Sequence, residues 1–454
     1  MPTVIGLIFF AASVCFFFLK DDKLFALVIF SAIFASSSVV DLNGAGIEPY
    51  YLVATAFILQ SIIRGRIRIG ASNSFRGKRW MISFAIIGIL SAVTLPFVFA
   101  GIPVYDPHLG IDDGLFIRPP LQFTHTNLTH SLFLLVDVLV VLAASQTFRG
   151  RSVSKKAYTF TFYFLAGTVM LQFLLPLIGI EFPYSLLQNH AGVNLSTVEA
   201  GDLSSRYPGT FLEPSGAGQV LGCFTAGFLA ERLKFGRSLF LALAGLTAVF
   251  LIRSSGSIAA VGVTFVLLLL SFPIFRFPYY INITRLRRAV LMIGIGALVL
   301  TAIIFSPLRD SLIEMTLNKQ ESGSYVNRIA SDAYALNLLT RTYEMGVGMG
   351  SNRPSSIITS LLSTVGVLGL VAFVLTYFKL LSNARLHDSW VRWAGLALFI
   401  SMATSGPDYD APWLWAFLAF AVRMGKLSNE ELPEIDGLPD RKSNNPGHVL
   451  LFPQ

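Results

Sequence analysis

The chain has 454 residues, of which 54% are hydrophobic and 13% are charged, and its formal net charge is +8. Soluble domains carry about a quarter charged residues, so this composition excludes an ordinary soluble domain and indicates a chain solvated by lipid. The positive charge is explained by membrane topology rather than by nucleic-acid binding, because basic residues collect on one side of a membrane protein.

Long apolar runs, bounded by charged residues, glycine or proline, predict the transmembrane helices. Roughly twenty mostly apolar residues cross the hydrocarbon core of a bilayer. The predicted spans are 2–19, 24–40, 50–63, 80–100, 131–147, 157–180, 214–230, 238–252, 256–275, 289–306, 356–380, 391–405 and 412–424. The third and the last are short for a crossing. The expected fold class is therefore all-α, a polytopic transmembrane helix bundle of about 12–13 spans.

Basic segments predict the orientation of this bundle, because Lys and Arg of short loops are retained in the cytoplasm. These segments are 64–79, 148–156, 231–237, 276–288 and 379–392. With the predicted spans they all fall on one face, which places the N-terminus outside and the C-terminus in the cytoplasm. The transmembrane domain, 1–427, then includes the outer (periplasmic) loops 101–130, 181–213 and 307–355. The polar tail, 428–454, is predicted to be disordered and cytoplasmic.

Cysteine usage predicts neither a disulfide framework nor a metal site. Cys15 and Cys223 both lie inside predicted spans, and no Cys/His spacing of the metal-binding kind is present. We therefore expect no metal and no cofactor. The first span begins at the initiator Met and lacks a basic leading region, so it is interpreted as a retained helix rather than a cleaved signal peptide.

The third outer loop, 307–355, is too long for a simple connection and is predicted to carry a helix. Its apolar stripe begins after Ser324 and has a helical period. The stripe comprises Val326, Ile329, Ala330, Ala333, Tyr334 and the segment from Leu336 to Leu339. Gly346 is a plausible end for this helix, which we expect to lie on or near the outer membrane surface.

Four ionisable residues at or beside membrane depth need a partner or a task, because burying a charge in hydrocarbon costs about a few kcal/mol. Arg206 and Arg353 abut spans on the outer side, and the other two lie within or at the end of a span. Asp137 lies near the middle of its span, where it is either a carboxylate bonded to a neighbouring helix or part of a proton relay. Arg253 ends a span just before a Ser-rich turn. It is either a snorkelling residue at a helix end or an anion-binding residue.

Two polar runs shape the outer ends of spans. One, 205–215, contains Arg206, Glu213, two prolines and a glycine. The other, 346–356, places Gly348, Gly350 and Arg353 before a long span. Glycines let backbone amides approach a phosphate closely, and an arginine matches its oxygens with a planar fork, although a glycine-rich helix boundary alone is common.

Arg206, Arg253 and Arg353, with Arg328 on the loop helix, are thus predicted to gather at the outer ends of late spans. Such a cluster favours a polyanion. A diphosphate presented at the outer leaflet is the obvious one for a membrane-embedded chain.

At these residues the sequence resembles the O-antigen ligase and polymerase superfamily, bacterial membrane glycosyltransferases. The likeness covers roughly 200–380 and is carried by three stretches, 206–215, 253–257 and 328–369. The ligase branch typically has a His at the place of Ser355 and Ser356. Its absence favours a polymerase, or a related exopolysaccharide-assembly enzyme, over a ligase.

The resemblance implies a GT-C-like architecture and a metal-independent glycosyl transfer on the outer face of the inner membrane. The donor would be a saccharide on undecaprenyl diphosphate and the acceptor another saccharide, with a chain-length regulator as a further partner. Arg206, Arg253 and Arg353 would neutralise the diphosphate. Further binding residues would be Arg328, Ser257, Gly348 and Gly350.

The acceptor hydroxyl would need a base, or a carboxylate that orients it. Glu213 is the first candidate, with Asp332 and Glu199 behind it. Glu213 could equally serve only to pair with Arg206.

Two other classes of function remain open. A transporter or flippase for an anionic or lipid-linked substrate would also need about a dozen spans, but typically shows paired halves and midplane charges. This chain shows one-sided arginines and large loops on one face only. A structural scaffold protein is the other alternative.

Overall fold

The computed structural model describes residues 2–19, 21–42, 45–66, 75–105, 117–146, 151–189, 206–235, 238–271, 323–384 and 388–425. Over these ranges the regular structure is helical, apart from one two-residue antiparallel pair formed by β1 (Asp41–Leu42) and β2 (Ala45–Gly46). The all-α expectation is confirmed for this part of the chain.

The helices follow the predicted spans closely. They are α1 (Val4–Phe17), α2 (Asp21–Ser31), α3 (Pro49–Ile63), α4 (Lys78–Val98), α6 (His125–Gln146), α7 (Arg151–Leu177), α8 (Tyr184–Leu187), α9 (Pro214–Phe235), α10 (Leu239–Ile252), α11 (Ser255–Leu270), α14 (Gly323–Arg341), α15 (Ile357–Leu381), α16 (Trp390–Ser405) and α17 (Pro412–Met424). A helix occupies twelve of the predicted span ranges. The remaining range, 289–306, lies outside the described residues, as does the tail 428–454.

Four of these helices, α4, α6, α7 and α15, are long and apolar enough to cross a membrane. Five shorter apolar helices, of 10–17 residues, accompany them: α1, α3, α10, α11 and α17. Their outward side chains include many exposed large apolar residues, such as Phe97 and Leu368. Helices with so many exposed large apolar side chains are stable in lipid but not in water, so the described helices belong to a membrane protein.

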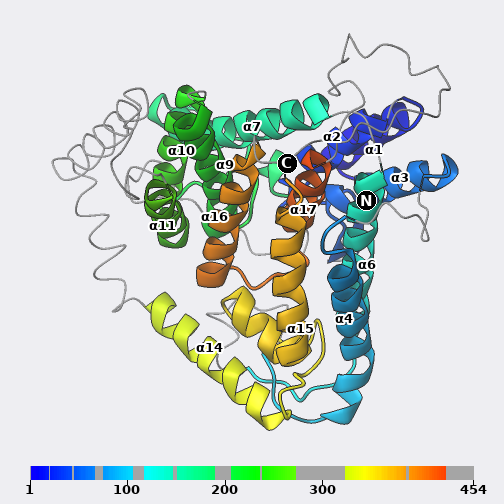
Figure 1. Ribbon diagram of the computed structural model, residues 1–454. Helices are drawn as coiled ribbons and strands as arrows, with labels where there is room; N and C mark the ends of the chain where they lie inside the picture. Colours follow the sequence, from blue (N-terminus) through cyan, green and yellow to red (C-terminus); the bar gives the residue numbers. More distant parts are fainter. Residues whose placement is uncertain are drawn as a thin grey trace, which may run out of the picture.

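Three groups of helices pack around α17 (Figure 1). One contains α4, α6 and α15; another contains α9, α10, α11 and α16; the third contains α1, α2, α3 and α7. α17 contacts α6, α15 and α2, and its side chains are almost all buried. This central position explains how a helix of only 13 residues, which the sequence marks as short, is held in the bundle.

α14 confirms the helix predicted in the third outer loop. It runs obliquely past the lower ends of α15 and α16 in Figure 1 and packs on α15. Its apolar stripe is split, with Leu338 buried and Val326, Ile329 and Leu336 exposed. The helix ends at Arg341 and not at the predicted Gly346, where the chain makes a separate turn with φ +82°.

The second predicted span is wrong at its C-terminal end, because α2 stops at Ser31 rather than continuing to residue 40. Three consecutive serines hold the segment after the helix to distant backbone. Ser36 and Ser37 donate their hydroxyls to the carbonyl of Leu187, and Ser38 donates to the carbonyl of Asn189. Hydroxyls that bond to distant backbone in this way compete with a continuing helix.

Asp137 forms a hydrogen bond to a neighbouring helix, which is one of the two roles that its position in the sequence allows. Its side chain is fully buried in α6, and the Tyr50 hydroxyl of α3 donates to its Oδ1 at 2.8 Å. The bond joins two helices inside the bundle.

Candidate functional site

The segments singled out in the sequence meet at one end of the bundle. A Cβ added at Gly218, near the start of α9, would lie 2.2 Å from Ser257 Oγ on α11. One added at Gly256 would lie 2.6 Å from Ser405 Oγ, at the end of α16. The Gly406 amide then donates to the Ser355 carbonyl at 3.1 Å. The starts of α9, α11 and α15 and the loop after α16 therefore form one continuous surface.

Three of the four predicted arginines form one electrostatic group. Partial desolvation lowers the pKa of Arg206, and the positive charges of Arg328 and Arg253 lower it further. Among the described residues, no hydrogen bond or ion pair joins these three guanidinium groups to a protein partner. Positive charges that lie close together, with no paired acid in the part of the chain that the structure describes, favour the binding of an anion. We call Arg206, Arg253 and Arg328 the arginine group.

Arg253 is held rigidly within this group. It is only 8% exposed and forms the turn between α10 and α11 with φ +54° and ψ +40°. A side chain other than glycine costs about 1 kcal/mol in this left-handed conformation. The short turn fixes the backbone of Arg253 at the point where α10 ends and α11 begins.

Arg353 does not belong to the arginine group, because it pairs with Asp408 in the loop between α16 and α17. Its Nε and Nη2 donate to the two carboxylate oxygens at 2.9 and 2.8 Å, a bidentate geometry. The Asp408 charge raises the pKa of Arg353 and outweighs burial. Burial favours the neutral form of Asp408, but the Arg353 charge and hydrogen bonds prevail and lower its pKa.

Gly348 and Gly350 make close contacts with neighbouring helices. A Cβ at Gly348 would lie 2.8 Å from Pro96 Cδ of α4, and one at Gly350 would lie 2.9 Å from the Thr126 carbonyl of α6. The Gly348 amide donates to the Thr364 carbonyl at 2.9 Å. Both glycines also have a positive φ, so their identity is accounted for by backbone packing.

Ser257 is likewise enclosed. Its side chain is fully buried and donates to Ser254 Oγ at 3.0 Å. It supports the turn that carries Arg253 from the side of α11.

The candidate acids have different surroundings. Glu213 is exposed, accepts a hydrogen bond from Ser215 at 2.9 Å, and lies within electrostatic range of Arg353. Asp332 of α14 accepts three hydrogen bonds, from the Ser355 amide and hydroxyl and from the Thr359 hydroxyl. Asp332 therefore holds α14 against the start of α15. Glu199 lies outside the described residues.

Sequence reasoning missed a histidine–aspartate pair beside Arg353. His130, on the first turns of α6, bonds through Nδ1 to Oδ2 of Asp410. A Cβ at Gly350 would lie 3.1 Å from His130 Cδ2, and both Arg353 and Asp408 lie within electrostatic range of the ring. His130 had been assigned to an outer loop because α6 was predicted to begin at 131. The sequence feature that could have indicated this pair is the presence of two acids, Asp408 and Asp410, in the short loop 406–411.

Glu48 adds a third carboxylate to this region. It stands immediately before α3, and burial, followed by the charges of Asp410 and Asp408, raises its pKa to about 8. Its Oε2 is buried without a hydrogen-bond partner among the described residues. Arg353 and His130 thus lie within electrostatic range of a group of carboxyl side chains, Glu48, Asp408 and Asp410.

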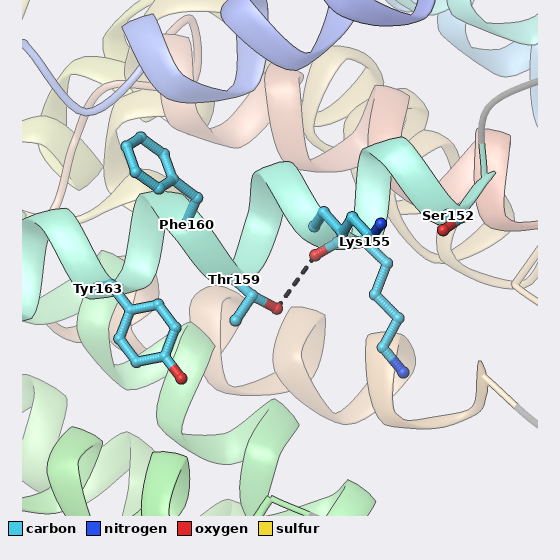
Figure 2. A pocket seen from close by; sticks show the side chains of 6 residues that line it. Ser152, Lys155, Thr159, Phe160 and Tyr163 are labelled. Carbon is cyan, nitrogen blue, oxygen red and sulfur yellow. Dashed lines mark hydrogen bonds between the residues drawn. The ribbon is translucent and has the colours of Figure 1, made fainter.

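A shallow depression of about 490 Å³ lies on α7 (Figure 2). Its lining comes from that helix alone: Ser152, Lys155, Lys156, Thr159, Phe160 and Tyr163. Lys155 Nζ is already bound to Glu231 at 2.7 Å. This depression has no convergent set of polar groups from several elements, so we do not assign it to the site.

No protein-family model matches the chain, and no curated protein matches it.

Proposed function

We propose that this chain is a membrane glycosyltransferase that polymerises or transfers undecaprenyl-diphosphate-linked saccharide units on the outer face of the bacterial inner membrane, in O-antigen or exopolysaccharide biosynthesis. The supporting observation is the arginine group: the start of α9 packs on the turn that carries Arg253, and Arg206 lies close enough to Arg253 and Arg328 for their charges to lower its pKa. The sequence resemblance rests on the same stretches of the chain.

The arginine group would stabilise the diphosphate leaving group in such a transfer. When the bond between the anomeric carbon and the diphosphate breaks, the leaving oxygen gains negative charge. Preorganised cations stabilise that charge most strongly where water is excluded. Arg253 is the buried member and Arg206 the exposed one, so the group extends from the bundle toward solvent.

Arg353 would act indirectly in this scheme. Its bidentate bond to Asp408 fixes the loop between α16 and α17 beside the start of α15. The residue would therefore hold the walls of the site in place instead of contacting the diphosphate.

The proposal includes a GT-C-like bundle of about thirteen spans with an external N-terminus and a cytoplasmic C-terminus. Polymerisation is preferred to ligation because Ser355 and Ser356, at the place of the ligase His, serve the start of α15. Ser355 donates to Asp332, and Ser356 Oγ accepts the Thr359 amide as the helix N-cap.

The decisive test uses cells that lack the protein. Electrophoresis of surface and lipid-linked polysaccharide should reveal single lipid-linked repeats in the deletion strain. Full-length polymer retained on its lipid carrier would instead identify a ligase. An unchanged pattern would contradict both and favour transport.

Complementation with point variants links this phenotype to the site. We expect Arg253→Ala to reduce polymer formation by about 100-fold or more, because removal of one preorganised donor from a transition state has an effect of this size. Arg341→Ala is the matched control, since Arg341 is an exposed arginine at the far end of α14. It should complement fully, with both variants inserted in the membrane to the same level.

A further inference from the structure

The histidine–aspartate pair has the geometry of an oriented base. Asp410 is 6% exposed and fixes His130 through Nδ1, while the His130 side chain is 29% exposed. Among the described residues, Nε2 of the ring has no hydrogen-bond partner. A carboxylate on one ring nitrogen holds the tautomer in which the other nitrogen carries a free lone pair.

The carboxylate of this pair is itself anchored. Its loop is fixed where the Tyr51 hydroxyl of α3 donates to the Asp410 carbonyl at 3.2 Å. The Trp415 indole of α17 donates to the Tyr409 carbonyl at 2.9 Å. Contacts from α3 and α17 thereby hold the backbone of the loop that carries Asp410, and Asp410 in turn bonds to His130 of α6.

The pair lies next to the rest of the site. Arg353 is within electrostatic range of both His130 and Glu213, and the segment that carries Glu213 continues back to Arg206. His130 is thus on the same end of the bundle as the arginine group, and Arg353 is an electrostatic neighbour of both His130 and Glu213.

We propose that His130, oriented by Asp410, is the general base that activates the acceptor hydroxyl, an inference that rests on the proposed function. Nε2 takes the hydroxyl proton as the acceptor oxygen bonds to the anomeric carbon. The bond from that carbon to the diphosphate oxygen breaks, and its electron pair leaves with the lipid diphosphate, whose charge the arginine group holds. The proton remains on His130 until the product departs.

This assignment differs from the one that the resemblance implies. Glu213 is exposed and is bound by Ser215, and Asp332 is fully engaged with the start of α15. Neither is supported by a second group that fixes its orientation toward an acceptor. His130 is both partly accessible and oriented.

The test uses the full-length protein in proteoliposomes. The probe is the lipid-linked saccharide fraction extracted from cells that lack the protein, and product is followed by electrophoresis. We expect His130→Ala to reduce turnover about 100-fold or more, the usual contribution of a general base. Added imidazole should restore part of the turnover, since it can enter the space left by the ring.

Matched variants separate a base from a structural residue. His130→Gln fills the space without a base and should stay inactive. His125→Ala, which removes an exposed histidine one turn earlier on α6, should behave as wild type. Arg253→Ala should be inactive and should not respond to imidazole.

The outcomes distinguish the two proposals. If wild-type protein produces no polymer from this fraction, or no such fraction accumulates, the proposed function fails. If wild type is active and His130→Ala retains turnover within a few-fold, or is inactive without response to imidazole, the role of His130 as base is overturned. Loss of activity in Glu213→Gln alone would assign the base to Glu213.

Discussion

At the scale of single residues, the most informative pair is Arg353 with Asp408. The two side chains are 34% and 40% exposed, so solvent screens their attraction although their geometry is bidentate. Their function is to connect the segment before α15 to the loop between α16 and α17. The sequence singled out the arginine but gave no reason to select its partner.

A double-mutant cycle on Arg353→Ala and Asp408→Ala should give a coupling of about 1 kcal/mol at neutral pH, measured by thermal unfolding in detergent. The pKa of Asp408 is lower in the folded chain than its usual 3.8, so the pair stabilises the fold above that value. The contribution should disappear as the pH falls through the lowered pKa. A coupling that stays constant as the pH falls far below 3.8 would contradict this explanation.

The sequence could locate the arginine group because a charge at the end of an apolar span stands out. It could not locate the histidine–aspartate pair, whose members are 280 residues apart. Neither residue is unusual locally: His130 stood in a predicted loop, and Asp410 stood in a short turn. Only the packing of α6 beside α17 brings them together.

At the scale of elements, the break in α15 organises the loop that precedes it. Gly366 has φ +70° and ψ −171°, so the carbonyls of the preceding turn are released from the helix. The amides of Val347 and Gly348 donate to the Ser363 and Thr364 carbonyls, at 2.8 and 2.9 Å. The Val367 amide in return donates to the Glu344 carbonyl at 3.1 Å. A kink inside one helix thereby holds the segment 344–348 without further secondary structure.

Gly366→Ala should destabilise the protein by about 3 kcal/mol, because the added Cβ would lie 2.2 Å from the Glu344 carbonyl and φ is positive. Gly167→Ala in α7 is the control, since a Cβ there meets nothing within 4 Å. That variant should be neutral or slightly stabilising. Equal melting temperatures for the two variants would show that the kink is not needed.

Element positions were predictable where the apolar runs are long and uninterrupted, as in α4, α7 and α15. The prediction is weaker at the ends of the helices, where side chains form hydrogen bonds with residues that are distant in the sequence. α2 ends early, and serine hydroxyls bind the segment after it to distant backbone. α6 begins inside the predicted outer loop because Thr124 and Asn127 close its first turn. The Thr124 amide donates to Asn127 Oδ1 at 2.9 Å.

At the scale of the whole molecule, the starts of α6, α9, α11 and α15 lie together and carry the polar site. The predicted basic segments follow the opposite ends of these helices. This arrangement agrees with the alternation of spans read from the sequence, although the orientation in a membrane stays a prediction.

Cysteine labelling tests that orientation. In a Cys15→Ala, Cys223→Ala background, Met345→Cys should react with a membrane-impermeant maleimide on intact spheroplasts. Arg79→Cys, at the start of α4, should react only after the membrane is permeabilised. Both positions are exposed on the protein, so the difference reports the membrane side alone. The reverse pattern would invert the topology.

The lengths of α10 and α11 have a consequence for the lipid around them. With 14 and 16 residues, at 1.5 Å per residue, they reach only about 21 and 24 Å, against a hydrocarbon thickness of about 30 Å. In the proposed topology, helices this short would leave the turn that carries Arg253 below the plane of the surrounding head groups. The leaflet would then thin beside the turn, and the phosphates of the proposed lipid carrier would reach the guanidinium without its chain leaving the bilayer.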